Sequence, residues 1–339
     1  MRQLGLSRAR TSAVKPSIWY DRTIPEEFRA ELSPGGTFER LVGFAHGRHL
    51  ADVQLRAVGS LSWATIYCGL TNVLHLEYRR TRGYRLRADN RYMNANQAGP
   101  SEGILGWTTW SMAAQLMAGW PAIEAYMTGQ FKSVAKRYIG EGAVQAMLCA
   151  NGGESYQVID REAVFGFRDT RERERVHEEL RTPLVDALAG PSSDGWWKPP
   201  TKLGGELDIL AVDARGRLLV MEVKPADSLA GITWAPLQVS FYARLFQHWS
   251  EAVGEESAGI LNRMLGQRIA IGLQEQSSVS LSYPLDIVPV IAIGDPVHPQ
   301  GLARLQAVQA QLLKAGQGDD NLEVWLVGPN MAIKHHHLG

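Results

Sequence analysis

The sequence is poor in cysteine, in net charge and in leader-like apolar residues, and each shortage excludes a class of protein. Only two cysteines, Cys68 and Cys149, occur in 339 residues, so a disulfide-stapled scaffold is excluded and a reducing, cytoplasmic location is expected. The 35 basic and 35 acidic side chains cancel, which excludes a uniformly basic nucleic-acid coat protein. The first residues contain no apolar stretch of signal-peptide length, so no signal peptide is expected.

Motifs for nucleotide-driven or zinc-dependent chemistry are also missing. The chain contains no Walker lysine motif, no Gly-x-Gly-x-x-Gly after a strand, no zinc-ligand spacing and no Gly-x-Ser-x-Gly. One uncharged segment, 103–123, approaches the length of a membrane span, but Gly106, Gly119 and Pro121 interrupt it. We expect a buried helix pair there, and a soluble protein with no membrane partner and no NTPase motor of its own.

The organisation of the chain favours two domains, as its length suggests. The clearest break is the Asn-Gly-Gly sequence at 151–153. Before it we expect a flexible polar arm (1–22) and an α+β domain of undetermined fold (23–150), and after it a second domain (151–330) and a short tail (331–339). The first hundred residues carry fifteen basic and eight acidic side chains, which suits either a surface facing a polyanion or an ordinary solvated surface.

Hydrophobic periodicity predicts secondary structure in both domains. In the first domain we expect helices at 25–32 and 37–48, strands at 51–56, 63–67, 73–80 and 84–87 with a hairpin turn at 81–83, and helical segments up to 148. In the second we expect strands at 156–160 or 163–167, 206–212, 218–224, 287–293 and 322–327, and helices at 170–188, 236–249, 255–265 and 302–313. Strands interleaved with helices indicate an α/β fold, a mixed sheet with helices on its faces.

The strands 206–212 and 218–224 carry the residues that point to chemistry. Side chains alternate along a strand, so Glu222 and Lys224 project from the same face at the end of the second strand. An antiparallel hairpin brings the start of the first strand, and with it Asp208, level with them. Such oxygen ligands suit Mg²⁺ or Mn²⁺, and Lys224 could stabilise charge on a phosphate under attack. The alternative is an ordinary ion pair at a strand end.

This pattern resembles the PD-(D/E)XK nuclease superfamily over about residues 155–330. Asp208 matches its first acidic residue, Glu222 and Lys224 match its (D/E)XK element, and Leu207 stands where the name has proline. The resemblance implies a restriction-endonuclease-like core of a helix, a three-strand meander, a helix and a further strand. It also implies a metal held by Asp208, Glu222 and the backbone carbonyl of Val223.

Two helices beside the motif offer supporting residues. Gln238 and Tyr242 lie four apart, which resembles the QxxxY element of RecB-like members, although Tyr242 could instead border the buried face of its helix. The resemblance also implies a metal-binding glutamate on the helix before the meander. We take that helix to be 170–188 and choose Glu179, which borders its apolar stripe, although glutamates among arginines also form solvated ion pairs.

The strongest functional feature of the first domain is an arginine-rich hairpin with interleaved tyrosines. Its basic residues could contact phosphates, and the candidates for nucleic-acid binding are Arg79, Arg80, Arg82, Arg85, Arg87 and Arg91. The alternative is an exposed hairpin whose arginines pair with Glu77 and Asp89.

Together these features predict a metal-dependent nuclease, an endonuclease with DNA favoured over RNA as substrate, for which restriction or phage defence is a setting by analogy. A homodimer would let two sites cut two strands. Two other hypotheses stay open: a non-catalytic nucleic-acid-binding or assembly module that retains the nuclease fold, and an enzyme acting on another phosphate ester.

Overall fold

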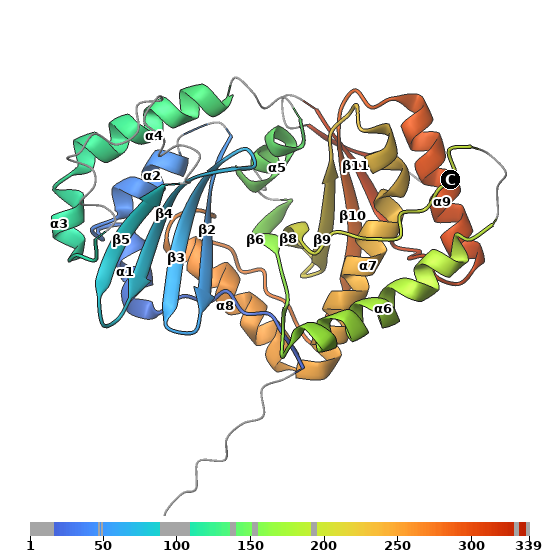
Figure 1. Ribbon diagram of the computed structural model, residues 1–339, viewed down its shortest axis with the longest axis horizontal. Helices are drawn as coiled ribbons and strands as arrows, with labels where there is room; N and C mark the ends of the chain where they lie inside the picture. Colours follow the sequence, from blue (N-terminus) through green and yellow to red (C-terminus); the bar gives the residue numbers. More distant parts are fainter. Residues whose placement is uncertain are drawn as a thin grey trace, which may run out of the picture.

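The computed structural model of the protein describes residues 17–46, 48, 50–88, 109–135, 140–150, 155–190, 195–328 and 332–336. Within them the chain forms a four-stranded sheet, a six-stranded sheet and a two-stranded ribbon. The two larger sheets lie beside each other, each with its own helices (Figure 1).

The N-terminal sheet is an antiparallel meander in the order β2-β3-β4-β5, and its hydrophobic core faces the helices that precede and follow it. Its strands are β2 (Ala51–Val58), β3 (Leu61–Cys68), β4 (Thr71–Arg79) and β5 (Gly83–Ala88). Its helices are α1 (Glu26–Leu32), α2 (Glu39–His46), α3 (Ala113–Met117) and α4 (Trp120–Ala135). The predicted strands and the hairpin turn are confirmed. Gly83 adopts a positive φ of 83° at that turn, and glycine tolerates this conformation best.

The six-stranded sheet has the order β12-β11-β10-β9-β8-β6 and mixes strand directions. Its strands are β6 (Tyr156–Ala163), β8 (Leu207–Asp213), β9 (Leu218–Lys224), β10 (Ile287–Gly294), β11 (Glu323–Val327) and β12 (Ile333–His336). The first three strands along the chain pair antiparallel, whereas β9, β10 and β11 pair parallel. Every residue of β9 is buried, as expected of a central strand covered on both faces. The predicted mixed sheet is confirmed.

Helices cover both faces of this sheet. On one face α7 (Leu229–Val253) packs against β9 and β10, with α6 (Thr170–Ala187) and α9 (Pro299–Lys314) outside it (Figure 1). The other face meets α5 (Glu141–Ala150), whose Val144 and Leu148 join the apolar side chains of the sheet. The strands β8 and β9 therefore have a helix on either face of the sheet, α7 on one and α5 on the other.

The predicted arm and tail are wrong where the structure describes them. Ile18–Trp19 forms β1, which pairs with β7 (Gly166–Phe167), and Ile18 and Tyr20 are fully buried in the C-terminal core. Two apolar residues, Ile18 and Tyr20, are too few to give a periodicity signal in the sequence. Their burial in the C-terminal core nevertheless fixes this segment in place. Within the tail, β12 pairs antiparallel with β11, so backbone hydrogen bonds order it despite its polar side chains.

The helix predicted to begin at Pro236 begins instead at Leu229, so Pro236 lies inside α7. An internal proline removes one helical hydrogen bond. Upstream residues Ile232 and Ala235 are completely buried, and this burial outweighs the lost bond.

Packing divides the chain differently from the break at 151–153, which lies outside the described residues. Helix α5 packs on the C-terminal sheet although it precedes that break. Conversely, α8 (Glu256–Ala270) is followed by Ile271 and Leu273, which are buried in the N-terminal core. The N-terminal sheet with its helices and the six-stranded sheet with its helices form two bodies. Each body contains a segment that the break at 151–153 would assign to the other.

The uncharged segment is described from residue 109 onward, where α3 and the first half of α4 pack on the N-terminal core. None of the described helices is both long and apolar enough to span a bilayer. Cys68 and Cys149 are both buried and unpaired with each other.

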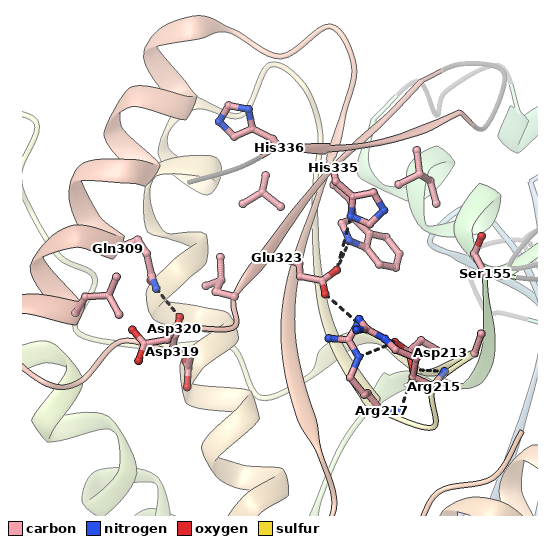
Figure 2. Close-up of a pocket in the computed structure, with 16 residues that line it drawn as sticks. Ser155, Asp213, Arg215, Arg217, Gln309, Asp319, Asp320, Glu323, His335 and His336 are labelled. Carbon is pink, nitrogen blue, oxygen red and sulfur yellow. Dashed lines mark hydrogen bonds and ion pairs between the residues drawn. The ribbon is translucent and has the colours of Figure 1, made fainter. Parts of the chain in front are cut away.

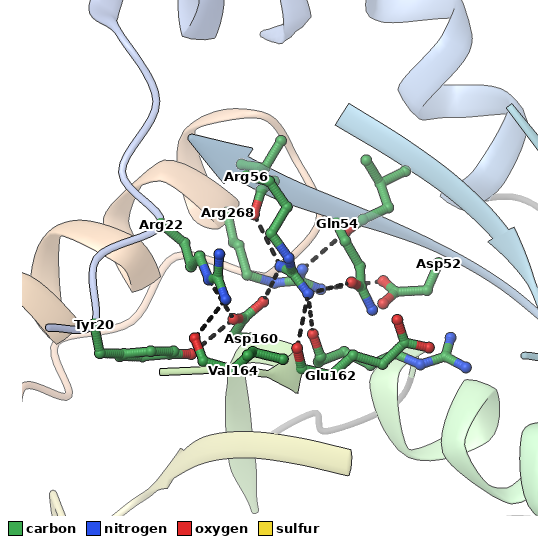
Figure 3. A network of polar contacts seen from close by, with 12 residues as sticks. Tyr20, Arg22, Asp52, Gln54, Arg56, Asp160, Glu162, Val164 and Arg268 are labelled. Atoms are coloured by element: carbon green, nitrogen blue, oxygen red, sulfur yellow. Dashed lines mark hydrogen bonds and ion pairs between the residues drawn. The ribbon is translucent and has the colours of Figure 1, made fainter. Parts of the chain in front are cut away.

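A buried polar network joins the two bodies (Figure 3). Arg56 of β2 donates through Nη1 to Oδ1 of Asp160 on β6 at 2.5 Å, and the Tyr20 hydroxyl donates to Oδ2 at 2.7 Å. Arg268, at the end of α8, donates through Nη2 to Asp52 Oδ1 at 3.2 Å. Because removing one partner of a buried ion pair costs about 3–5 kcal/mol, this network holds the sheets in one arrangement.

Candidate active site

The hairpin of β8 and β9 places the predicted acidic residues side by side. Ile209 pairs with Met221, and extending this register by one residue sets Asp208 opposite Glu222. The first acidic residue of the pattern therefore lies level with the second, as the hairpin geometry predicts.

The three side chains are held by short hydrogen bonds. Lys224 donates through Nζ to Glu222 Oε1 at 2.5 Å, and the backbone N–H of Val223 donates to Asp208 Oδ2 at 2.7 Å. Glu222 is 3% exposed, and its second oxygen, Oε2, has no hydrogen-bond partner among the described residues. A buried carboxylate oxygen without a donor is costly unless another ligand satisfies it.

The electrostatics of this cluster favour a bound cation. Burial raises the pKa of Asp208 well above its usual range, and the neighbouring Glu222 carboxylate raises it further. Burial likewise raises the pKa of Glu222, although Lys224 opposes this shift. Burial lowers the pKa of Lys224, but the carboxylates of Glu222 and Asp208 outweigh it, so the net shift is upward and Lys224 keeps its proton. Two acidic side chains lie beside one ammonium, so ionisation of both would leave excess negative charge.

Helix α5 supplies two polar residues that sequence reasoning missed. Gln145 donates through Nε2 to Asp208 Oδ1 at 2.7 Å. Glu141, one turn earlier, raises the pKa of both Asp208 and Glu222 through its charge. The signal that could have found Glu141 is its position at the start of the helix that directly precedes β6, the first strand of the meander.

The choice of Glu179 is not supported by the geometry. Its side chain is 57% exposed and pairs with Arg175 at 2.8 Å on the surface of α6. Helix α6 connects β6 to β8 and packs on α7, so it is not the helix that precedes the meander. The solvated ion pair, weighed as the alternative, is what the structure contains.

Of the QxxxY pair, Tyr242 faces the cluster. It is 2% exposed, and its hydroxyl lies 2.8 Å from where a Cβ on Gly204 would stand, just before β8. Burial raises its pKa, and the charges of Glu222 and Asp208 raise it further. Gln238 lies one turn earlier on α7 and is half-buried. Tyr242 therefore closes the side of the site opposite α5.

The donor set fits a hard divalent cation. Asp208 and Glu222 provide oxygen atoms, the kind of ligand that Mg²⁺ and Mn²⁺ prefer, and Glu222 Oε2 has no hydrogen-bond partner among the described residues. No group of three or more histidine, cysteine, aspartate or glutamate side chains is placed to hold a metal within the described ranges. A metal here would need the Val223 carbonyl and water to complete its coordination.

The arginine-rich hairpin lies at the outer edge of the N-terminal sheet, away from β8 and β9 (Figure 1). Arg85 and Arg87 both pair with Glu77, at 2.5 and 3.1 Å. The other contacts are Arg80 with Glu27, and the guanidinium groups of Arg79 and Arg85 against the Trp110 ring. Arg82 is exposed at the turn, whereas Arg91 and Asp89 lie outside the described residues. For Arg85 and Arg87 the structure thus contains the pairing with Glu77, which is the alternative to nucleic-acid binding.

A separate hollow of 810 Å³ lies at the opposite end of β8 and β9 (Figure 2). Arg217 bridges Asp213 at 2.7 Å and Glu323 at 3.0 Å across it. Arg217 thus links two carboxylates in one chain of ion pairs, which is typical of a structural network.

Comparison with known proteins adds no assignment. The chain matches no family model, and neither a curated protein nor a solved structure matches it. The functional argument therefore depends on the residues themselves.

Proposed function

We propose that the protein is a metal-dependent nuclease of the PD-(D/E)XK type, acting on DNA in preference to RNA. The observation that carries this proposal is the buried group of Asp208, Glu222 and Lys224, in which Glu222 Oε2 has no partner within the described structure. The strand order β10-β9-β8-β6, with α5 and α7 on opposite faces, supports it because the proposed family has the same core.

The side chains divide the chemistry between them. A divalent metal held by Asp208, Glu222 and the Val223 carbonyl would polarise a phosphoryl oxygen and lower the pKa of a bound water. Lys224 retains its proton, so it acts as a fixed positive charge toward the phosphate and not as a general base. Tyr242 also retains its proton and can donate a hydrogen bond.

A non-catalytic binding module is the second candidate, and one observation favours it. Both oxygens of Asp208 already accept hydrogen bonds, from Gln145 and from the Val223 backbone. If this arrangement persisted, Asp208 would have less capacity to bind metal. Such a module would bind nucleic acid without cutting it.

One assay separates the candidates. The purified full chain is incubated with supercoiled plasmid, linear duplex, single-stranded DNA and RNA, each with Mg²⁺, Mn²⁺ or EDTA. We expect metal-dependent cleavage that Asp208→Ala and Lys224→Ala abolish. The control is Glu179→Gln, which changes an exposed carboxylate on α6 and should cut like the wild type. Binding without cleavage under every metal would favour the second candidate, and equal cutting by Asp208→Ala would refute the first.

A further inference from the structure

Arg161 on β6 is completely buried, and among the described residues its guanidinium donates to a side-chain amide and to a backbone carbonyl. It donates through Nε to Gln145 Oε1 at 3.0 Å and through Nη2 to the carbonyl of Gly69 at 2.5 Å. Its guanidinium also lies over the Tyr67 ring, 5.1 Å from the centroid. A buried charge held only by neutral groups is expensive, which calls for a role beyond stability.

A β-bulge places Arg161 on the face of the sheet that α5 covers. The pairing of β6 with β8 shifts between Val158 and Asp160, so Val158 pairs with Ala211 whereas Arg161 pairs with Ile209. Both pairs belong to the face that α5 covers. Without the extra residue, alternation would point Arg161 to the other face, since a one-residue slip reverses every side chain.

The hydrogen-bonding roles of the neighbours fix the Gln145 amide in one orientation. Arginine is only a donor, so the oxygen of the amide must face Arg161. The NH₂ group is then left to face Asp208, and it donates to Oδ1 at 2.7 Å. Without the Arg161 bond the amide could flip, and its NH₂ group would no longer donate to Asp208.

The β3–β4 turn of the N-terminal sheet holds both residues in place. Gly69 in this turn accepts the Arg161 bond, and the adjacent Leu70 packs against α5. A Cβ on Gly142 of α5 would stand only 2.8 Å from the Leu70 backbone nitrogen. The turn therefore touches the helix that carries Gln145 with no space between them.

The backbone beside Arg161 is strained and is fixed from the same sheet. Glu162 has a positive φ of 52°, which is unfavourable for a residue with a side chain. The Tyr67 hydroxyl donates to Glu162 Oε2 at 2.8 Å, and Arg56 donates to the Glu162 carbonyl at 3.2 Å. Contacts from β2 and β3 thus maintain a conformation that β6 would not adopt alone.

We propose that Arg161 and Gln145 are positioning residues for the Asp208 carboxylate, and that the β3–β4 turn of the N-terminal sheet keeps them in position. The proposal rests on the function proposed above, and it gives the N-terminal body control over the site. Displacing the turn would release Arg161, then the Gln145 amide, and then Asp208.

The test needs a readout that does not depend on cleavage. The backbone N–H of Val223 donates to Asp208, so its amide resonance in ¹⁵N-valine-labelled protein reports the carboxylate position. We expect this resonance to move in Gln145→Met, Arg161→Lys and Gly142→Ala, with far-UV circular dichroism unchanged. Cleavage should fall by about 10- to 100-fold, as for other partners that orient metal ligands. Lysine should not rescue, because it lacks the fork that reaches two acceptors.

Gly266→Ala on α8 is the matched control, since a Cβ there meets nothing within 4 Å. It should leave both the resonance and the cleavage rate unchanged. If Gly142→Ala fails to fold, Leu70→Ala loosens the same contact by removing atoms. An unmoved Val223 resonance in Gln145→Met and Arg161→Lys would overturn the proposal. A wild type that cuts no substrate would refute the nuclease function, and the Val223 resonance would still decide the positioning roles.

Discussion

Two aspartates of strand β8 lie in opposite electrostatic surroundings. At the end of the strand, Asp213 accepts backbone N–H groups from Arg215 and Arg217 at 2.9 Å and the Arg217 Nε at 2.7 Å (Figure 2). Burial raises its pKa, but these hydrogen bonds and the Arg217 charge lower it more, so the net shift is downward. Near the start of the strand, burial and Glu222 raise the pKa of Asp208 instead.

The difference separates a carboxylate whose ionisation stabilises the fold from one whose ionisation is unfavourable in the folded protein. Asp213 is surrounded by donors, so its charge contributes to folding. Asp208 also accepts two hydrogen bonds, but burial and the neighbouring carboxylates of Glu222 and Glu141 outweigh them, so its ionisation is unfavourable. Such local cost is expected at functional sites, where stability is given up for activity.

The largest expected difference between Asp208 and Asp213 is in how the free energy of unfolding responds to metal. Mg²⁺ should raise the free energy of unfolding of the wild type, by about 2.7 kcal/mol at a concentration of 100 Kd. Asp208→Asn should lose this stabilisation, whereas Asp213→Asn should retain it. Thermal unfolding with and without EDTA measures it, and an equal response from both variants would show that the two ends of β8 do not differ in metal binding.

In EDTA, Glu222 at one end of the β8–β9 hairpin and Asp213 at the other should change the free energy of unfolding with pH in opposite directions. The raised pKa of Glu222 means that its ionisation destabilises the fold as pH rises above about 4. The free energy of unfolding of Glu222→Gln should therefore fall less than that of the wild type between about pH 4 and pH 7.

The lowered pKa of Asp213 predicts the reverse. Its contribution is complete above about pH 4 and is lost as pH falls through the lowered pKa. Asp213→Asn should be less stable at pH 7 by about 1 kcal/mol. Chemical denaturation at several pH values measures both curves, and curves of the same sign would contradict the comparison.

The smallest expected effect is at the rim of the Asp213 network. Glu323 pairs with Arg217 at 3.0 Å and is partly exposed. Glu323→Gln should change the free energy of unfolding by less than about 1 kcal/mol, as for other half-exposed ion pairs. Denaturant midpoints measure the change, and a larger loss would mean that this end of β8 is as tightly coupled as the Asp208 end.

Sequence patterns were sufficient for the four strands of the N-terminal sheet, for β8 to β11 and for the central cluster, but not for β1 and β12. Strand β9 is an apolar run ending in Glu222 and Lys224, and alternation together with a hairpin was enough to place Asp208 beside them. Most helices followed from periodicity, apart from the start of α7. These features are local, so short windows of sequence contain them.

What the sequence could not predict depends on contacts distant along the chain. Gln145 is 63 residues from Asp208, and no local pattern links an uncharged amide on one helix to a carboxylate on a later strand. The bulge in β6 shifts the strand pairing by one residue and so decides which face Arg161 lies on. Hydrophobic periodicity does not locate such a shift to a single residue. The prediction of Glu179 failed because α6 is inserted between β6 and β8. The helix that comes before the whole meander is α5.

The placement of β1 bears on how the protein can be divided. Because Ile18 and Tyr20 belong to the C-terminal core, the N-terminal sheet is an insertion between β1 and α5 of that core. Cutting the chain before β6 would remove both a strand and the Gln145 helix from the six-stranded body. A minimal fragment would instead join residue 22 to residue 140 through a linker and keep both ends of the interrupted unit.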